Sequence, residues 1–231
     1  MLHIILIKGH DRLSKGARSY NGISEYELYG RVFPVTLQHL SKYNCKVHME
    51  ERNPRFDYKP INNRIKSIRA LDPNARIVTF EGHFNSFYRV ALGCEMLALE
   101  SDPASFESAD IFTDHFSNMM NIKERHKTQK ADGVKGLDTD DRGASCLGII
   151  RGADERMLFE CAFLNTENPD SVSIIGSDTS IINYGLVIAR CLVNTYNLQS
   201  QEQDPSMLVN ALKSKIDRLE SKLEKIRLLV A

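Results

Sequence analysis

Two histidines and one glutamate stand where side chains of an α/β protein commonly do chemistry. Each comes directly after a short apolar run: His10 after residues 2–7, His83 after 75–80 and Glu160 after 157–159. In open α/β sheets, ligands bind beyond the carboxyl ends of the strands. If the three runs are neighbouring strands, two imidazoles and a carboxylate meet at one edge of the sheet and could bind one metal ion.

Each of these residues taken alone also fits a structural role. A single histidine is commonly a surface or core residue, and Glu160 could equally cap a helix or form an ion pair. Cys161 follows Glu160 and would point to the opposite side of a strand, so we interpret it as a core residue rather than a nucleophile. The remaining histidines lack comparable context: His3, His39, His48, His115 and His126.

The apolar patterns predict the elements that must position these groups. Leu2–Ile7 is almost continuously apolar, which is typical of a central strand covered on both faces. Further strands are expected over 46–50, 75–80, 92–99, 146–150 and 157–159, and helical spacing is found over 28–40, 61–71, 105–120 and 180–196. Pro34 should kink its helix or lie at an edge. The alternation predicts a single α/β domain with a mostly parallel or mixed central sheet flanked by helices.

Two further segments differ in composition from this domain. Residues 121–143 have few apolar side chains and predict a long exposed loop, either functional or mobile. After the domain (1–198) and a polar linker (199–205), residues 206–231 form a predicted amphipathic helix. Its apolar residues follow a coiled-coil heptad: Val209, Leu212, Ile216, Leu219, Leu223, Ile226 and Val230. We expect a homo-oligomer through this helix; the alternatives are packing on its own domain or contact with a membrane or wall.

The overall composition excludes several classes of protein. Lys+Arg and Asp+Glu both number 30 in 231 residues, so a cationic nucleic-acid binder is not expected. The five cysteines are odd in number and form no CxxC, which predicts neither a disulfide framework nor a cysteine zinc site. No apolar run reaches the ~18–20 residues of a membrane span. The N-terminus lacks the features of a signal peptide, so synthesis in the cytoplasm is expected.

Six short motifs in order resemble the zinc-dependent N-acetylmuramoyl-L-alanine amidases of the amidase-3 class, over roughly residues 2–198. That class has Gly-His with Gly-Ala six and seven residues later, Asn-Gly-apolar-x-Glu before a helix, and His-x-Asn at a strand end. It also has Gly-x-Glu, Arg-Gly, and a late apolar-Glu-x-Gly-Phe-apolar segment. The corresponding segments here are 9–17, 21–28, 83–85, 93–95, 142–143 and 158–165.

The sequence departs from this pattern at several positions. The acidic residue that is common three positions before the first histidine is Ile7 here, and the glycines after that histidine are Asp11 and Arg12. The glycine after the catalytic glutamate is replaced by Ala162, and the usual Thr-Arg pair reads Glu51-Arg52. None of these departures removes a metal ligand.

The resemblance implies roles for particular residues. His10, Glu25 and His83 would bind Zn²⁺, and Glu160 would be the general base and then the proton donor; Glu27 could replace Glu25 on chemistry alone. Asn85 and Arg142 would contact substrate, although Arg142 could also be a solvated loop charge. The implied substrate is peptidoglycan, cut at the amide between N-acetylmuramic acid and L-alanine.

Two other functions stay open from the sequence. The same fold could serve as a wall-binding or assembly protein with weak catalysis, or as a zinc peptidase without sugar recognition. A chain made without a signal peptide and acting on the wall after release would suit a phage endolysin; a bacterial enzyme exported by another route is the alternative.

Overall fold

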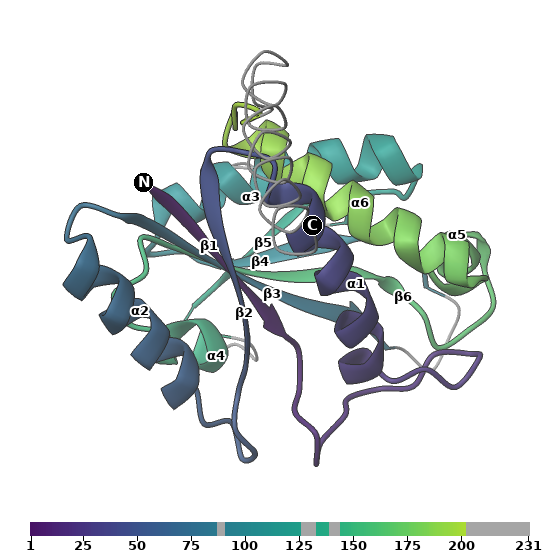
Figure 1. Ribbon diagram of the computed structural model, residues 1–231. Coiled ribbons are helices and arrows are strands. Elements are labelled where there is room, and N and C mark those ends of the chain that lie inside the picture. Colours follow the sequence, from purple (N-terminus) through teal and green to yellow (C-terminus); the bar gives the residue numbers. More distant parts are fainter. Residues whose placement is uncertain (87–90, 126–132, 139–143, 202–231) are drawn as a thin grey trace, which may run out of the picture. The chain divides into compact units, whose positions relative to one another are not determined.

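A computed structural model describes residues 1–86, 91–125, 133–138 and 144–201. Residues Met1–Gln199 form a compact unit. The described residues build one six-stranded sheet in the order β2-β1-β3-β6-β4-β5 (Figure 1). Strands β2, β1, β3 and β6 are parallel, and β4 pairs antiparallel with β6 while β5 follows β4. The predicted α/β fold with a mixed sheet is therefore confirmed.

Strands and helices alternate along most of the chain, as predicted, apart from α4, β5 and α5. The strands are β1 Leu2–Lys8, β2 Cys45–Glu51, β3 Arg76–Asn85, β4 Glu95–Leu99, β5 Val134–Leu137 and β6 Glu155–Phe163. The helices are α1 Glu25–Leu40, α2 Lys59–Leu71, α3 Pro103–Met120, α4 Ala144–Ile149, α5 Pro169–Ile175 and α6 Asp178–Thr195.

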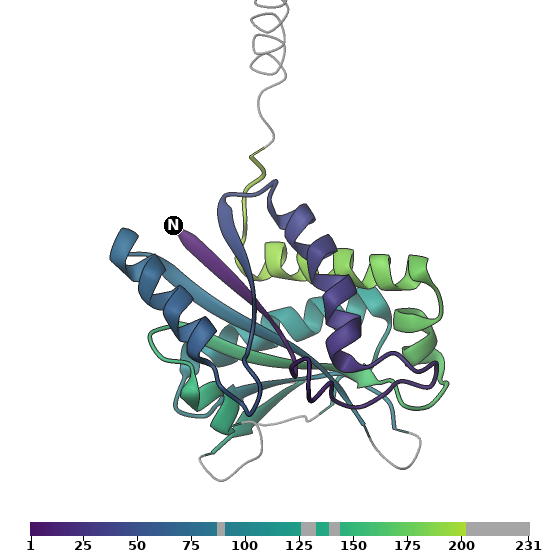
Figure 2. The same ribbon diagram turned by 60° about the horizontal axis from the view of Figure 1, so that its bottom comes forward.

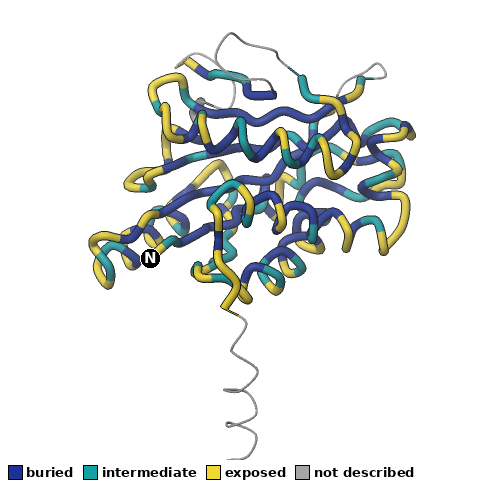
Figure 3. The backbone as a smooth tube through the Cα atoms, turned by 90° about the horizontal axis from the view of Figure 1, so that it is seen from above, coloured by how far each residue is buried: buried dark blue, intermediate teal, exposed yellow. Residues whose placement is uncertain are grey.

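The sheet is covered on both faces, and β1 shows why its sequence is apolar throughout. Ile4 and Leu6 belong to the large core beneath α1, α3 and α6, whereas Ile5 and Ile7 pack against α2 on the other face. All four side chains are fully buried. Figure 3 shows the same layering, with buried residues along the strands and exposed ones on the outer sides of the helices. A strand buried on both faces cannot alternate apolar and polar residues.

The strand predicted over Cys146–Ile150 is wrong, because residues 146–149 are in α4 and Ile150 directly follows it. Leu147 and Ile150 are buried while Gly148 and Ile149 between them are exposed. A spacing of three places both buried side chains on one side of a helix, whereas in a strand they would point to opposite faces. A short apolar run does not distinguish the two structures by composition alone.

The exposed loop predicted over 121–143 is also wrong in part. Residues 134–137 form β5, which pairs with β4, and Val134 and Leu137 are buried. This strand offers only two apolar residues around Lys135 and Gly136, too few for a recognisable pattern. Residues 126–132 and 139–143, including Arg142, lie outside the described residues, as does the predicted heptad segment 206–231.

Pro34, where a kink or an edge position is predicted, lies inside helix α1, which continues to Leu40. Pro34 is exposed, and so is Gly30, whose carbonyl loses its helical partner to the proline. Water can therefore take the place of the missing hydrogen bond, while Val32 and Phe33 keep their buried positions.

No single helix in the described ranges is long and apolar enough to cross a membrane; α5 and α6 pass that test only as a pair bent by 92°.

Candidate metal centre

The carboxyl ends of β1, β3 and β6 meet at one edge of the sheet, and the predicted groups lie there. His10 follows β1, His83 is near the end of β3, and Glu160 is its register partner on β6. Strand β4 runs in the opposite direction, so its first residue, Glu95, pairs with Glu160 at the same edge. His83 and Glu160 lie within their strands rather than after them, because β3 and β6 extend beyond their apolar runs.

The start of α1 supplies the third group, Glu25. Ser24 is the N-cap, and its hydroxyl and the Glu27 side chain form a reciprocal capping box. Glu27 is also paired with Lys15 at 2.7 Å between Nζ and Oε1. Glu27 is therefore engaged at the helix start and on the surface, which leaves the buried Glu25 to face the histidines.

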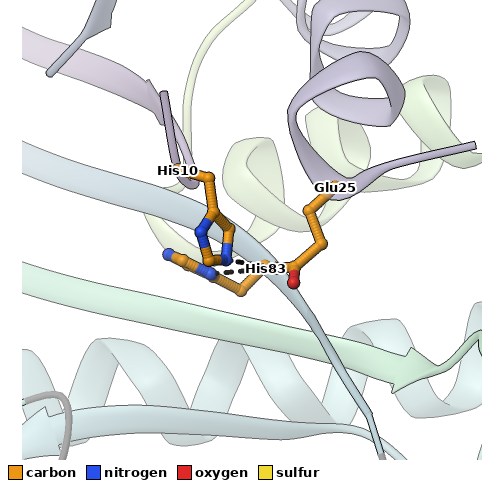
Figure 4. Close-up of side chains that lie close together, drawn as sticks. All are labelled: His10, Glu25 and His83. Atoms are coloured by element: carbon orange, nitrogen blue, oxygen red, sulfur yellow. Dashed lines mark hydrogen bonds and ion pairs between the residues drawn. The ribbon is translucent and has the colours of Figure 1, made fainter. Parts of the chain in front are cut away.

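His10, Glu25 and His83 form one cluster (Figure 4). Glu25 Oε2 lies 3.1 Å from His10 Nε2 and 3.1 Å from His83 Nδ1. The other carboxylate oxygen, Oε1, accepts a hydrogen bond of 2.8 Å from the backbone N–H of Ala17. Glu25 thus has a fixed orientation, with one oxygen directed between the two imidazoles.

Two glycines make room for this cluster. A Cβ at Gly16, whose φ is +78°, would lie 2.4 Å from the His10 ring and 2.7 Å from Glu25 Oε1. A Cβ at Gly9 would lie 2.2 Å from the carbonyl oxygen of Gly82 and 2.9 Å from the His83 ring. The Gly-His and Gly-Ala motifs therefore have a steric basis in this chain, because the ligand side chains occupy the space beside both glycines.

The segment between β1 and α1 is held across the sheet edge. Tyr20 N–H donates to the carbonyl of Leu164 just after β6, at 2.8 Å, and the Asn21 amide donates to the carbonyl of Ile175 at 2.9 Å. Figure 2 shows this segment, in purple, passing from the end of β1 to the start of α1. It fixes the helix start that carries Glu25 relative to the strand that carries Glu160.

The electrostatics of the cluster favour a cation. Burial raises the pKa of Glu25, but hydrogen bonds with His10 and His83 outweigh it and lower that pKa to about 2. Burial lowers the pKa of His83, but hydrogen bonds to Glu25 and Glu81 outweigh it and hold the pKa well above its usual value. An environment that stabilises an imidazolium also stabilises a metal cation, for the same electrostatic reason.

The donor set fits a divalent metal ion. The three ligand atoms lie within 4.8 Å of one another, and they comprise two imidazole nitrogens and one carboxylate oxygen. Two His and one Glu with a fourth position open is a known arrangement of catalytic zinc, with bonds of about 2.0–2.2 Å. Small side-chain movements therefore suffice to place all three atoms on one ion.

Glu160 is the carboxylate best placed for acid–base chemistry. Its Oε2 atom is buried and has no hydrogen-bond partner among the described residues. Burial raises the pKa of Glu160; the charge of His83 opposes this and nearby glutamates add to it, giving a pKa of about 7. Glu81 and Glu95 are the other carboxylates nearby, and they are hydrogen-bonded to His83 and Asn85 respectively.

Comparisons with known proteins bear on this arrangement. No protein-family model matches the sequence, and none of the curated proteins matches it either. Solved structures do match. The CwlD amidase from Clostridioides difficile, in complex with the GerS lipoprotein, has a TM-score of 0.61 at 16% identity, covering 84% of this chain and 98% of that one.

Two further amidases match similarly. The catalytic domain of CwlV, an N-acetylmuramoyl-L-alanine amidase from Bacillus (Paenibacillus) polymyxa var. colistinus, has a TM-score of 0.59 at 16% identity, with 86% and 100% of the two chains covered. The apo form of Ami1 from Mycobacterium abscessus has a TM-score of 0.62 at 12% identity, with 84% and 98% covered. The chain has the fold of the N-acetylmuramoyl-L-alanine amidases. The predicted resemblance is thereby confirmed for the amidase fold.

The structure describes one of the two residues that are expected to contact substrate. Asn85 lies at the end of β3, and its amide donates a hydrogen bond of 2.7 Å to Glu95 Oε1. Because Glu95 pairs with Glu160, Asn85 is close to the candidate base. Arg142 lies outside the described residues, and the substrate contacts of both Asn85 and Arg142 stay predictions.

Sequence reasoning missed the buried polar residues behind the cluster. Tyr29 donates to the backbone carbonyl of His83 at 2.7 Å and packs where a Cβ at Gly82 would clash. Glu81 contacts the His83 ring and receives a hydrogen bond from Tyr58. The available signal was a charged residue, Glu81, directly after an apolar run and two positions before a histidine.

Proposed function

We propose that this protein is a zinc-dependent N-acetylmuramoyl-L-alanine amidase that cleaves peptidoglycan. The observation that carries the proposal is the His10–Glu25–His83 cluster, with Glu160 at the same sheet edge, on the amidase fold. The substrate bond is the amide that joins the lactyl group of N-acetylmuramic acid to the L-alanine of the stem peptide.

In this proposal His10, Glu25 and His83 bind the metal, and Glu160 transfers the proton. Zinc held by the three ligands would polarise the scissile carbonyl and lower the pKa of a water molecule. Glu160, as a carboxylate with an unbonded Oε2, takes the proton from the attacking water. It then gives that proton to the alanine nitrogen as the amide bond breaks, so that one group serves as base and then as acid.

Fragment mapping on purified peptidoglycan tests the proposal. Zinc-loaded protein should release stem peptides that begin with a free L-alanine amine and leave N-acetylmuramic acid with a free lactyl carboxylate. Mass spectrometry of the soluble fragments distinguishes this bond from every other bond in the wall. Cleavage only between stem amino acids would favour the zinc peptidase, and binding to the wall without any cleavage would favour the wall-binding protein.

We also propose a cellular setting for this activity. Synthesis in the cytoplasm, followed by action on the wall after release, would suit a lytic enzyme such as a phage endolysin. Fractionation of producing cells before and after lysis would test this setting, because wall cleavage should begin only after the protein leaves the cytoplasm.

The heptad pattern of residues 206–231 predicts self-association. Light scattering should give a dimer or larger species for the full chain and a monomer for a version ending at Gln203, because the apolar seam needs a partner helix. The shortened version should still cleave soluble substrate, since the four proposed catalytic and metal-binding residues all precede residue 199. A monomer in both cases would refute the coiled-coil interpretation.

A further inference from the structure

The His83 ring is held at both nitrogens. Nδ1 faces Glu25, as a metal ligand would, while Nε2 lies 3.0 Å from Glu81 Oε1. Glu81 is completely buried. In metal sites the second ring nitrogen of a ligating histidine is usually bonded to a carboxylate or carbonyl, which fixes the tautomer and the ring orientation.

Glu81 is itself held in place by a buried polar network. The Tyr58 hydroxyl lies 2.9 Å and 3.0 Å from its two oxygens. The Arg52 guanidinium donates to the Tyr58 hydroxyl at 3.2 Å, and its Nη1 atom lies 3.9 Å from Glu81. Arg52 also lies 3.9 Å from Asp11, the residue after His10. The positive charge of Arg52 therefore offsets the cost of burying the Glu81 carboxylate.

The position of Glu81 is related to the departure at Ile7. The amidase-3 pattern has an acidic residue where this chain has Ile7, and Ile7 is the register partner of Glu81 in the parallel pair of β1 and β3. Register partners in neighbouring strands point to the same face of the sheet. The His83 ring lies beside Gly9, which directly follows β1, since a Cβ there would lie 2.9 Å from its Cε1 and Nδ1. A carboxylate at position 7 or at position 81 can therefore lie beside this ring.

We propose that Glu81 is the positioning residue for His83 and that it supplies from β3 the carboxylate that the amidase-3 pattern places on β1. Glu81 accepts the Nε2 proton of His83, so that Nδ1 is left with its lone pair toward the metal. The proposal rests on the proposed metal centre, but it concerns metal binding and the state of one ring rather than turnover.

Zinc affinity of the Glu81→Ala variant tests the proposal. Competition with a chromophoric chelator should show zinc binding weakened by about 10–100-fold, the range found when such supporting groups are removed. The matched control is Glu155→Gln, because Glu155 is equally buried but lies at the other end of β6, where it pairs with Arg76. This control should bind zinc as tightly as the unmodified protein.

The ring itself gives a second readout. In the zinc-loaded protein, ¹H–¹⁵N spectra of histidine side chains should show a slowly exchanging proton on Nε2 of His83, and this proton should exchange rapidly in Glu81→Ala. If Glu81→Ala does not fold, Glu81→Gln keeps an acceptor without charge and should retain the Nε2 proton with weakened zinc binding. Recovery of zinc affinity when Ile7→Asp is added to Glu81→Ala would support the proposal that a carboxylate from β1 or from β3 can hold the His83 ring.

The outcomes separate this proposal from the proposed function. If the unmodified protein binds zinc and releases stem peptides while Glu81→Ala binds zinc within about threefold as tightly, only the positioning role is overturned. If the unmodified protein binds no zinc, both the metal centre and the role of Glu81 are overturned.

Discussion

Replacing His83 by alanine should abolish peptidoglycan hydrolysis. The variant loses the Nδ1 atom that faces Glu25 and leaves both Glu25 and Glu81 without their imidazole partner. Metal assistance contributes several kcal/mol to transition-state stabilisation, so the rate should fall by about 10³-fold or more. Release of dye from labelled cell walls measures the loss.

Removal of the metal by a chelator should have the same effect on activity as the His83→Ala substitution. Activity should disappear when zinc is removed and return when Zn²⁺ is added back. His115→Ala is the matched control, because His115 lies on α3 outside the cluster and its loss should leave activity unchanged. Full activity in metal-free protein, or in His83→Ala, would show that the cluster is not the catalytic centre.

Glu160→Gln should keep the metal but lose turnover. The change preserves the size of the side chain and removes its basic group, while His10, Glu25 and His83 stay intact. General acid–base groups are typically worth about 10²–10⁴-fold, and kcat should fall by that amount. Zinc content, measured on the same sample, should stay at one ion per chain. A loss below about tenfold with zinc still bound would assign the proton transfer to another group, with Glu81 and Glu95 the nearest carboxylates.

The pH dependence gives an independent check on Glu160. Burial raises its pKa, which lies at about 7 before any opposing effect of a bound cation. A general base must be ionised, so kcat/KM of the unmodified protein should fall as the pH decreases through this pKa. Because a divalent cation favours the charged carboxylate, the fall should occur at or below about pH 7 in the zinc-loaded protein. The residual activity of Glu160→Gln should lack this acidic limb.

The positions of the two histidines and of Glu160 at one sheet edge were predictable because their signals are local. A glycine-histidine pair after an apolar run indicates a strand end. The structure adds a reason for the glycine, because a Cβ at position 9 would collide with the His83 ring. Glu160 was predictable as a strand-end carboxylate in the same way. The choice of Glu25 over Glu27 depended on the family resemblance, and the capping box supplies its physical reason.

The parts that were missed depend on long-range contacts. Glu81 follows an apolar run, but the sequence does not show its contacts, because Tyr58 and Arg52, which hold it, come from a different segment. Strand β5 has only two buried side chains and exists through its pairing with β4. Helix α4 has a run of the right length for a strand, and only the sheet next to it determines which of its residues are buried.

The sheet order has a consequence for biosynthesis. Strand β6 lies between β3 and β4, although the ribosome produces it after both. From Asn85 at the end of β3 to Glu155 at the start of β6 is 155 − 85 = 70 residues. At a synthesis rate of about 5–20 residues per second, roughly 4–14 s pass between the completion of β3 and the start of β6. The edge of β3 that pairs with β6 has no β6 partner during this time. During that interval β3 and β4 could pair with each other, a hairpin that would exclude β6. The three proposed metal ligands have been synthesised by then, but β6, which carries the proposed base Glu160, has not, so each new chain has its proposed ligand set before its proposed catalytic site is complete.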